Sequence, residues 1–309
     1  MRVFLVFLLF LGFVFGEDLP FKTIQTQANV MSMTLVNDNL YIATYSGSIE
    51  IYDVKNDTFK QSIVFDDIKN INDEILRPNI LSIDELNGSL LVLAEANSNK
   101  RSLYLVKDSG IKLVSQLGES AKKALFLSEN EAILGTISNE ISIINLQNGK
   151  SEHDFKISTA LLADMKANPS KTTVAIATEG GKIYFYDVKS RDMSRIVDVH
   201  KDTMYAIDYD GNVVLTAGVD MSVAVLRGNE IRRLKAKTSV MDIALSTDAK
   251  TGAYIQDDLS EIYVFDTNSL TQVKRLQTPQ NTINSIVFIS PDMLLSSAFE
   301  KNIHFWKVR

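Results

Sequence analysis

Residues able to do chemistry are few in this chain and stand far apart. The 309 residues include three histidines and no cysteine, which excludes disulfides, thiolate metal sites, covalent haem attachment and cysteine nucleophiles. His153 and His304 have no carboxylate beside them at the spacing of a metal-binding motif, and no His-Glu-x-x-His occurs. We therefore predict no catalytic residue, no metal site and no bound cofactor.

Two other patterns match functional motifs only in part. Gly180-Gly181-Lys182 lacks the earlier glycine of a phosphate-binding loop, because Ile176 occupies that position, and a hairpin turn is the simpler interpretation. The acidic pairs at 66–67, 73–74 and 257–258 could act as acid and base or bind Ca²⁺, but they lack the spaced ladder of an EF-hand. We interpret them as solvated carboxylates in turns.

The main basic cluster does not predict a nucleic-acid partner. It consists of Arg227, Arg232, Arg233, Lys235 and Lys237, in a chain whose formal net charge is −6. A nucleic-acid surface would be broader and more strongly basic. A charged outer strand that discourages edge pairing is the more economical explanation.

Seven four-residue segments of alternating apolar residues, called the repeated figures below, recur along the chain and reveal its organisation. They are Ile49-Glu50-Ile51-Tyr52, Leu103-Tyr104-Leu105-Val106, Ile141-Ser142-Ile143-Ile144, Ile183-Tyr184-Phe185-Tyr186, Val223-Ala224-Val225-Leu226, Ile262-Tyr263-Val264-Phe265 and Ile303-His304-Phe305-Trp306. Their closing residues lie 54, 38, 42, 40, 39 and 41 positions apart, which is the period of a four-stranded propeller blade. Both faces of each figure are often apolar, as stacked blades require. The repeat predicts an all-β fold, a seven-bladed β-propeller, as one domain over residues 17–309.

A second column of residues has the same period. Nine positions before the closing residue, five of six blades carry a small side chain and one does not: Ala43, Gly135, Ala177, Ala217, Ser297 and the exception Gln256. In the second blade Ala94 lies twelve positions ahead, which predicts a three-residue insertion in that turn. We expect small residues where inner strands crowd a central channel.

The repeated figures resemble those of WD-repeat propellers. Three of them run on into Tyr52-Asp53, Tyr186-Asp187 and Phe265-Asp266, which are relaxed versions of the Trp-Asp pair of that family. The resemblance implies a rigid ring whose blades are held together by conserved types of hydrogen bond.

The fifth blade is the most similar to that family. His200, Thr216 and Asp220 stand where WD-repeat blades place the His, Ser/Thr and Asp that hydrogen-bond across a blade, which implies a structural network. Leu226 replaces the Trp that would complete the set, so we expect only a partial network. A role for His200 as ligand or general base is the alternative.

The two ends of the chain predict how the ring closes. The last blade stops at Val308-Arg309, directly after its third strand, and so lacks an outermost strand. The stretch from Phe21 to Thr26 alternates enough to supply it. We predict that this N-terminal strand pairs with the strand from Asn302 to Lys307 and removes an exposed edge.

The first sixteen residues have the pattern of a secretory signal peptide. Arg2 precedes an apolar run from Val3 to Phe15, and Val14 and Gly16 occupy the small-residue positions of a cleavage site. A retained anchor is the alternative, but thirteen apolar residues fall short of the ~20 that cross a bilayer. We predict cleavage after residue 16, no stable membrane insertion afterwards, and an acidic mature protein.

Composition favours the bacterial periplasm as the destination. The chain is rich in Lys, Asn and Ile and needs no disulfides, because a domain of this size has a large core. The sequons Asn56-Asp57-Thr58 and Asn87-Gly88-Ser89 would fit a eukaryotic secretory route instead, but two are close to chance in so Asn-rich a chain.

One connection is longer than the others, and it is where we expect a partner to bind. The step from the first to the second blade includes an insertion from Asp66 to Pro78. In WD-repeat geometry this connection lies on the face most used for partners, and long loops on rigid scaffolds often carry function. The candidate partner-binding residues are Asp66, Asp67, Asp73, Glu74 and Arg77.

Taken together, these features favour an exported, non-catalytic platform for protein–protein interaction. Overall the chain resembles the propeller accessory protein encoded with the periplasmic nitrate reductase of some bacteria, the NapL type. That resemblance implies assistance to the maturation or electron supply of a molybdenum- and haem-containing reductase, with that reductase or its electron-transfer proteins as partners. The alternative is a propeller enzyme of the lactonase or quinoprotein class with its site at the central channel.

Overall fold

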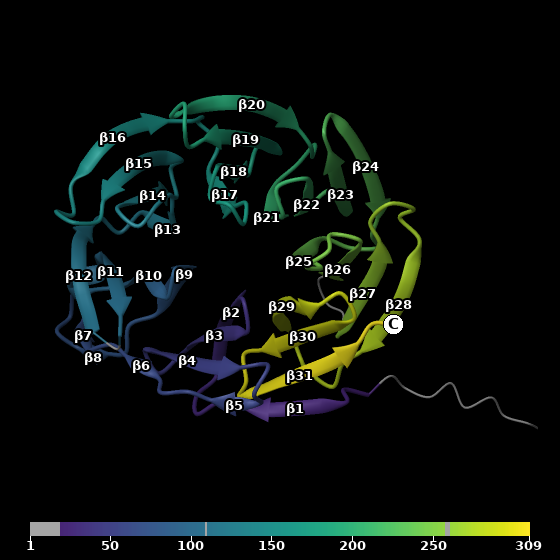
Figure 1. Cartoon of the computed structure of the whole chain (residues 1–309), viewed down its shortest axis with the longest axis horizontal. Helices are drawn as coiled ribbons and strands as arrows, with labels where there is room; N and C mark the ends of the chain where they lie inside the picture. The colour runs from purple at the N-terminus through teal and green to yellow at the C-terminus, as the bar shows by residue number, and fades with distance from the viewer. Residues whose placement is uncertain (1–18, 109, 257–259) are drawn as a thin grey trace, which may run out of the picture.

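Seven sheets stand around a central axis and form a closed ring (Figure 1). The computed structural model describes residues 19–108, 110–256 and 260–309, so the expected signal peptide at residues 1–16 lies outside the described part. Each sheet is antiparallel and runs from an inner strand at the channel to an outer strand at the rim. The predicted all-β, seven-bladed propeller is confirmed.

The first three blades follow one another along the chain. Blade 1 contains β2 (Val30–Val36), β3 (Asn39–Thr44), β4 (Ser48–Asp53) and an outer strand split into β5 (Thr58–Phe59) and β6 (Ile63–Val64). Blade 2 contains β9 (Ile80–Leu86), β10 (Ser89–Glu95), β11 (Arg101–Lys107) and β12 (Gly110–Leu117), with a 3₁₀ helix η1 (Asn97–Asn99) before β11. Blade 3 contains β13 (Ala121–Phe126), β14 (Glu131–Thr136), β15 (Glu140–Asn145) and β16 (Ser151–Lys156).

The next three blades keep the same order. Blade 4 contains β17 (Leu162–Ala167), β18 (Thr173–Thr178), β19 (Lys182–Asp187) and β20 (Asp192–Asp198). Blade 5 contains β21 (Met204–Tyr209), β22 (Val213–Gly218), β23 (Ser222–Arg227) and β24 (Glu230–Lys235). Blade 6 contains β25 (Val240–Leu245), β26 (Thr251–Gln256), β27 (Glu261–Asp266) and β28 (Gln272–Gln277).

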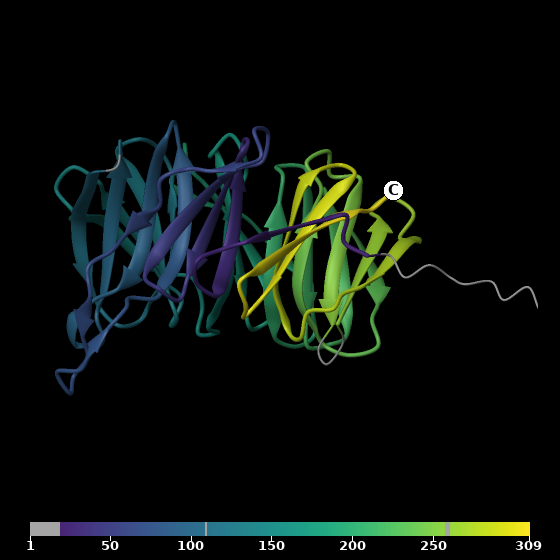
Figure 2. The same cartoon turned by 90° about the horizontal axis from the view of Figure 1, so that it is seen from below.

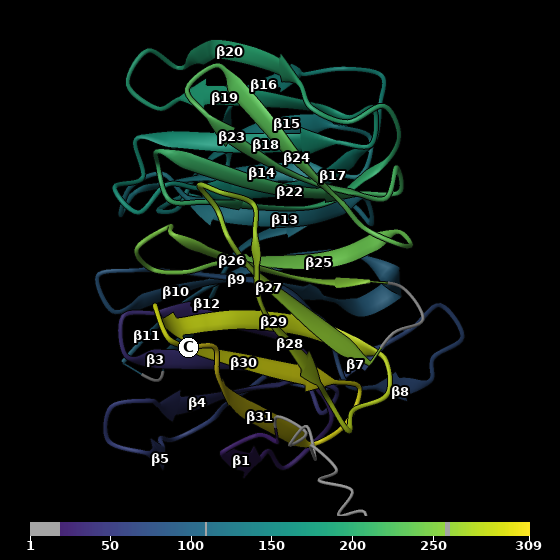
Figure 3. The same ribbon diagram turned by 90° about the vertical axis from the view of Figure 1, so that its right-hand side faces the viewer.

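Blade 7 combines the two ends of the chain, as predicted. Its inner strands are β29 (Ile283–Ser290), β30 (Met293–Ala298) and β31 (Asn302–Lys307), and its outer strand is β1 (Lys22–Gln25). Lys22 pairs with Phe305 and Gln25 with Asn302, and Figure 3 shows β1 beside β31 at the outer edge. The buried Ile24 packs in the cluster that joins blades 7 and 1. The predicted closure is confirmed.

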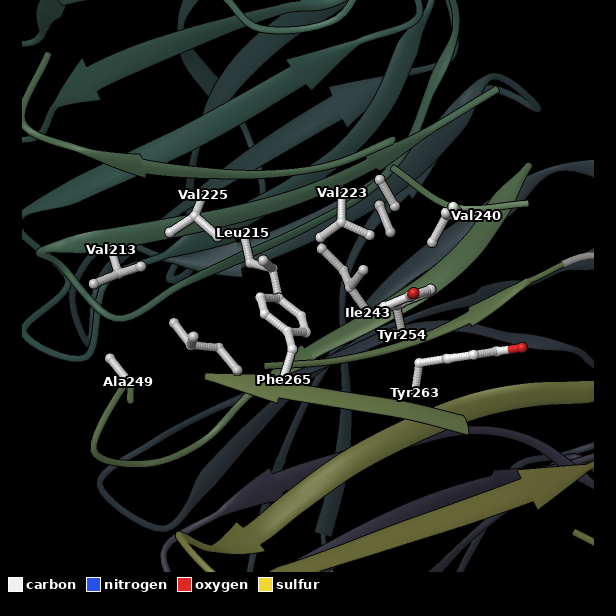
Figure 4. Packing of buried hydrophobic residues seen from close by; sticks show 14 residues of the cluster. Val213, Leu215, Val223, Val225, Val240, Ile243, Ala249, Tyr254, Tyr263 and Phe265 are labelled. Carbon is white, nitrogen blue, oxygen red and sulfur yellow. The ribbon is translucent and has the colours of Figure 1, made fainter. Parts of the chain in front are cut away.

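Apolar side chains fill every junction between neighbouring blades. Seven buried clusters occupy the seven junctions. Figure 4 shows the one between blades 5 and 6, where Leu215 and Val225 face Ile243 and Phe265. Because a central strand meets a different neighbour on each side, both of its faces must be apolar, which explains the figures in the sequence.

The column of small residues includes a position where an inner strand approaches closely. A Cβ added at Gly135 would lie 2.6 Å from Leu162 Cδ2 and 2.9 Å from Met165 Sδ, both on β17, the inner strand of the next blade. At this position a small residue is needed because the inner strand of the neighbouring blade packs against it.

Strand register also corrects the column in two blades. Ala43 pairs with Ile49, the first residue of its figure, whereas in blade 2 the residue that pairs with the equivalent Leu103 is Leu93 rather than Ala94. The turn of blade 2 is thus one residue longer than predicted. In blade 6 the residue that pairs with Ile262 is Ile255 and not Gln256. The turn between the second and third strands of this blade is one residue longer, so counting nine positions back selected the wrong residue.

The aspartates that follow three of the figures have a local structural role. Asp53 Oδ1 accepts the N–H of Asn56 at 2.9 Å, Asp187 Oδ1 that of Ser190 at 2.7 Å, and Asp266 Oδ1 that of Ser269 at 2.7 Å. Each carboxylate closes the turn to the outer strand, and these bonds hold the pKa of all three below its ordinary value. Short acceptors of this kind favour turns because they satisfy backbone donors locally.

Candidate interaction face and channel

The two faces of the ring are built from different loops. One face, here named the connection face, carries the connections between successive blades and the turns between second and third strands. It comprises residues 26–29, 45–47, 65–79, 96–100, 118–120, 137–139, 157–161, 179–181, 199–203, 219–221, 236–239, 278–282 and 299–301. The opposite face carries the other two turns of each blade.

Exposed apolar side chains are distributed very unevenly between the two faces. The connection face exposes Tyr45, Ile71, Ile75, Leu76, Ile137, Leu161, Met221 and Phe299, and Tyr205 and Met241 lie exposed at the near ends of their inner strands. In the part of the chain that the structure describes, the turns of the opposite face expose no large apolar side chain. The Tyr45 and Phe299 rings lie 6.1 Å apart and link blades 1 and 7.

The insertion between blades 1 and 2 forms a small hairpin on the connection face. Its strands are β7 (Ile68–Lys69) and β8 (Ile75–Leu76), and Figure 2 shows it projecting beyond the other loops. Asn70 Oδ1 accepts the N–H groups of Asn72 and Glu74 at 2.8 and 3.0 Å. Lys69 N–H donates to Asn97 Oδ1 at 2.7 Å, which fixes the hairpin to blade 2.

The five predicted partner-binding residues all lie exposed on this hairpin and its stem. Arg77 Nη1 pairs with Asp67 Oδ1 at 2.6 Å, and Glu74 Oε2 accepts a hydrogen bond from Asn70 at 2.6 Å. Among the described residues, Asp66 and Asp73 have no ion-pair partner. Sequence reasoning selected the charges of this segment and overlooked its exposed Ile71, Ile75 and Leu76.

His200, Thr216 and Asp220 lie in one hydrogen-bond network in blade 5. His200 Nδ1 is 2.9 Å from Asp220 Oδ1, and its Nε2 is 2.9 Å from Thr216 Oγ1. Burial lowers the pKa of His200 despite the opposing effect of Asp220, so the ring is neutral at pH 7. In the neutral ring Nδ1–H donates to the carboxylate and Nε2 accepts from Thr216. Ser222 Oγ, 2.6 Å from Asp220 Oδ1, adds a further donor.

Blade 7 contains an equivalent network that the sequence analysis missed. Trp306 Nε1 donates to Ser296 Oγ at 2.9 Å, and Ser296 donates to Gln280 Oε1 at 2.6 Å. Gln280 Nε2 then donates to Glu300 Oε1 at 3.1 Å. Gln280 precedes Ser296 by 16 residues and Glu300 by 20, the same spacings as in blade 5. Gln280 and Glu300 replace the usual His and Asp, so the spacing was the only available signal.

The remaining histidines and the basic cluster also have structural surroundings. His304 Nδ1 is 2.7 Å from Thr23 Oγ1 at the ring closure, whereas His153 is exposed on β16. Arg233 Nη2 donates to Val199 O at 2.6 Å, and Arg227 Nη2 to Thr267 Oγ1 at 2.7 Å. Arg233 therefore binds the connection that leads into its own blade, and Arg227 binds a turn of the next blade.

Charged side chains from several blades line the central channel, a cavity of about 440 Å³. Register places one residue of each inner strand at the same level nearer the connection face: Ser32, Ser82, Lys123, Asp164, Ala206, Asp242 and Ser285. Asp84, Lys166 and Asp208 stand one level deeper. Residues about 40 positions apart in sequence thus meet at the axis.

Lysines neutralise three of the four aspartates that inner strands place in the channel. Lys123 contacts Asp164, and Lys166 Nζ lies 3.3 Å from Asp208 Oδ1. The Asp208 carboxylate raises the pKa of Lys166 above its ordinary value.

The third pair crosses the channel mouth. Lys171 Nζ lies 2.6 Å from Asp84 Oδ2, which joins blade 4 to blade 2.

Three channel carboxylates also accept a backbone N–H from the next inner strand along the ring. Asp84 accepts Phe126 N–H at 2.7 Å and Asp208 accepts Leu245 N–H at 2.9 Å. Asp242 accepts Ile286 N–H at 3.1 Å. The carboxylates therefore hold inner strands together. Within residues 19–108, 110–256 and 260–309, no group of three or more His, Asp or Glu side chains is arranged to hold a metal ion.

Comparison with known proteins supports the fold. The chain is similar to the solved β-propeller domain of Cps50 (Swd1) from Myceliophteria thermophila, with a TM-score of 0.77 and 11% identity over 95% of this chain and 100% of that one. Among curated proteins it is 24% identical over 216 residues to the cilia- and flagella-associated protein 43 of Xenopus laevis. The chain is a WD-repeat-like seven-bladed propeller.

The extent of these matches limits what they show. The alignment covers 66% of this chain and only 13% of the Xenopus protein, and no protein-family model matches. The structural likeness at 11% identity concerns the fold alone. Neither comparison supports the narrower resemblance to the NapL type. In the described part of the chain, no helix has the length and apolar character needed to cross a membrane.

Proposed function

We propose that this protein is a non-catalytic interaction platform that binds a partner protein through its connection face. The observation that carries this proposal is the placement of exposed apolar residues on that face and not on the turns opposite. Apolar groups that become buried on association provide the main driving force, about 25 cal/mol per Å² of surface removed from water. The rigid ring holds the loops in place, so association costs little reordering of the platform.

The hairpin at 65–79 gives this surface a second kind of contact. Its exposed isoleucines project beside acidic residues, and it is anchored to blade 2 through Lys69 and Asn97. An apolar centre with a charged rim is the usual composition of a protein interface. We expect Asp66 and Asp73 to affect mainly the association rate and the choice of partner, because exposed rim charges act chiefly by steering.

The enzyme alternative has less support. Carboxylates from several blades do converge on the channel, but lysines pair with three of them, and the fourth, Asp242, accepts the N–H of Ile286. None of the three histidines lines the channel cavity. A general base would need a free acceptor and a neighbouring group to orient it. The three lysine-paired carboxylates lack the first, and no histidine lines the cavities beside Asp242 to provide the second.

We further propose that the platform works outside the cytoplasm, on the strength of the apolar segment from Val3 to Phe15. An exported partner in the same compartment then follows. A nitrate reductase or one of its electron-transfer proteins remains one hypothesis for that partner, and the interaction proposal does not depend on it.

The test is capture of partners by matched surface variants of the purified protein. We would replace Tyr45 and Phe299 by serine in one variant, and Ile111 and Leu113 on the outer strand β12 in the control. All four side chains are exposed, so both variants should fold like the wild type. A partner that the control retains and the Tyr45/Phe299 variant loses would support the proposal. Equal capture by both variants would refute it.

A further inference from the structure

One channel aspartate differs from the other three. Asp84, Asp164 and Asp208 each contact a lysine, whereas no Lys or Arg in the described residues pairs with Asp242. Its carboxylate accepts the N–H groups of Ile286 and Ile243. Because a carboxylate has about four acceptor sites, capacity for further donors remains. Four carboxylates thus face three lysines, and the unpaired charge is at Asp242.

Asp242 also lines a cavity that opens on the connection face. This cavity lies between blades 6 and 7 and has a volume of about 580 Å³, within the usual size range of ligand pockets. Met241 and Phe299 line it with exposed side chains, 42% and 51% accessible. The cavity thus combines one partly buried carboxylate with two exposed apolar side chains.

Two other polar side chains that line the cavity are already engaged. Asn284 Nδ2 donates to Val30 O at 2.9 Å, and its Oδ1 accepts from Ser297. Gln256 Oε1 accepts the N–H groups of Lys237 and Thr238. These bonds hold the walls in place, and among the described residues that line the cavity Asp242 is the one that can carry a charge.

We propose that this cavity binds one basic side chain, Lys or Arg, of the partner protein: its charged head pairs with Asp242, and its aliphatic stem lies between Met241 and Phe299. The inference rests on the proposed function, because both use the connection face. A basic side chain fits this cavity for two reasons. Its positive head is complementary in charge to Asp242, and the aliphatic stems of Lys and Arg pack favourably against apolar side chains. The Phe299 ring adds a face for a cation–π contact.

The pH dependence of binding follows from the surroundings of Asp242. Burial raises the pKa of Asp242 to about 7, and the charges of Asp164 on β17 and Asp208 on β21 act in the same direction. Among the residues that the structure describes, the segments of β26, β29 and the turns that line the cavity contribute only uncharged side chains. A basic head therefore binds better at pH 8, where Asp242 is ionised, than at pH 6.

The test uses small probes, so that it does not depend on finding the partner. N-acetyl-lysine amide and N-acetyl-arginine amide are titrated into the purified protein at pH 8 and followed by NMR, with N-acetyl-norleucine amide as the uncharged control. We expect a dissociation constant on the order of 1 mM for a basic probe, and loss of about tenfold or more in Asp242→Asn. The matched control is Asp108→Asn, on the opposite face, where Asn tolerates the positive φ.

Each outcome decides. The inference is supported if a basic probe binds the wild type and Asp108→Asn but not Asp242→Asn, and if the norleucine probe does not bind the wild type. Equal binding to the wild type and Asp242→Asn, or no binding of either basic probe at pH 8, would overturn it. Capture of a partner that depends on Tyr45 and Phe299 but not on Asp242 would leave the interaction platform standing and remove only the basic anchor.

Discussion

Replacing the unpaired channel carboxylate should stabilise the protein in a pH-dependent way. The pKa of Asp242 is about 7 in the folded chain against an ordinary value of 3.8. Between about pH 4 and 7 the folded state therefore binds more protons than the unfolded state, and the wild type loses stability as the pH rises. At pH 8 this pKa shift lowers the free energy of unfolding of the wild type by about 4 kcal/mol. Water in the channel should reduce this loss to roughly 2 to 4 kcal/mol.

Thermal unfolding of the wild type and Asp242→Asn at pH 4 and pH 8 measures this effect. The amide keeps an acceptor for Ile286 N–H and removes the charge, so the variant should melt about 5 °C or more above the wild type at pH 8. At pH 4 the two should differ by less than about 1 kcal/mol. A variant that is less stable at pH 8, or a difference that does not change with pH, would show that Asp242 is not a buried unpaired charge.

Three further predictions concern the scaffold. Ile24→Ala in the closing strand should cost about 2 to 4 kcal/mol by leaving a cavity between blades 7 and 1, and an unchanged melting curve would contradict the importance of that closure. His200→Ala should cost about 2 kcal/mol because it removes one buried donor to Asp220 and the partner of Thr216; chemical denaturation measures this, and a neutral result would refute a structural role. Gly181→Ala should destabilise by more than about 1 kcal/mol, since φ is +76° and an added Cβ would lie 2.2 Å from His200 O. Gly228→Ala, at φ +53° with open space around it, should destabilise the protein less than Gly181→Ala. Equal effects of the two substitutions on the melting temperature would show that the close approach of Gly181 to His200 O is not the cause.

The repeat in the sequence was sufficient to predict the ring and its closure. Both depend on a period and on the alternation of apolar residues, which are local properties of the chain. The residue-level alignment was less accurate, because Ala94 and Gln256 were placed by counting across turns of unequal length. Pairing partners define register, and a sequence alone does not contain them.

The site was less accessible to prediction for a related reason. Lys123 lies about forty residues before Asp164 and Asp242 about eighty residues after it, and only the ring geometry brings them together. The apolar residues of the connection face, such as Tyr45 and Phe299, occur singly in different turns. No window of sequence contains them all, so the sequence analysis selected the acidic insertion, which is contiguous.

The most direct test of the interaction face is photo-crosslinking from defined positions on both sides of the ring. A photoreactive phenylalanine analogue would replace Phe299 or Ile71 on the connection face, and Lys189 or Asn212 in turns of the opposite face. In extract from the source organism, the first two positions should crosslink to the same partner protein and the last two should not. Crosslinks of equal yield from Lys189 or Asn212, or none from Phe299 and Ile71, would contradict binding through the connection face.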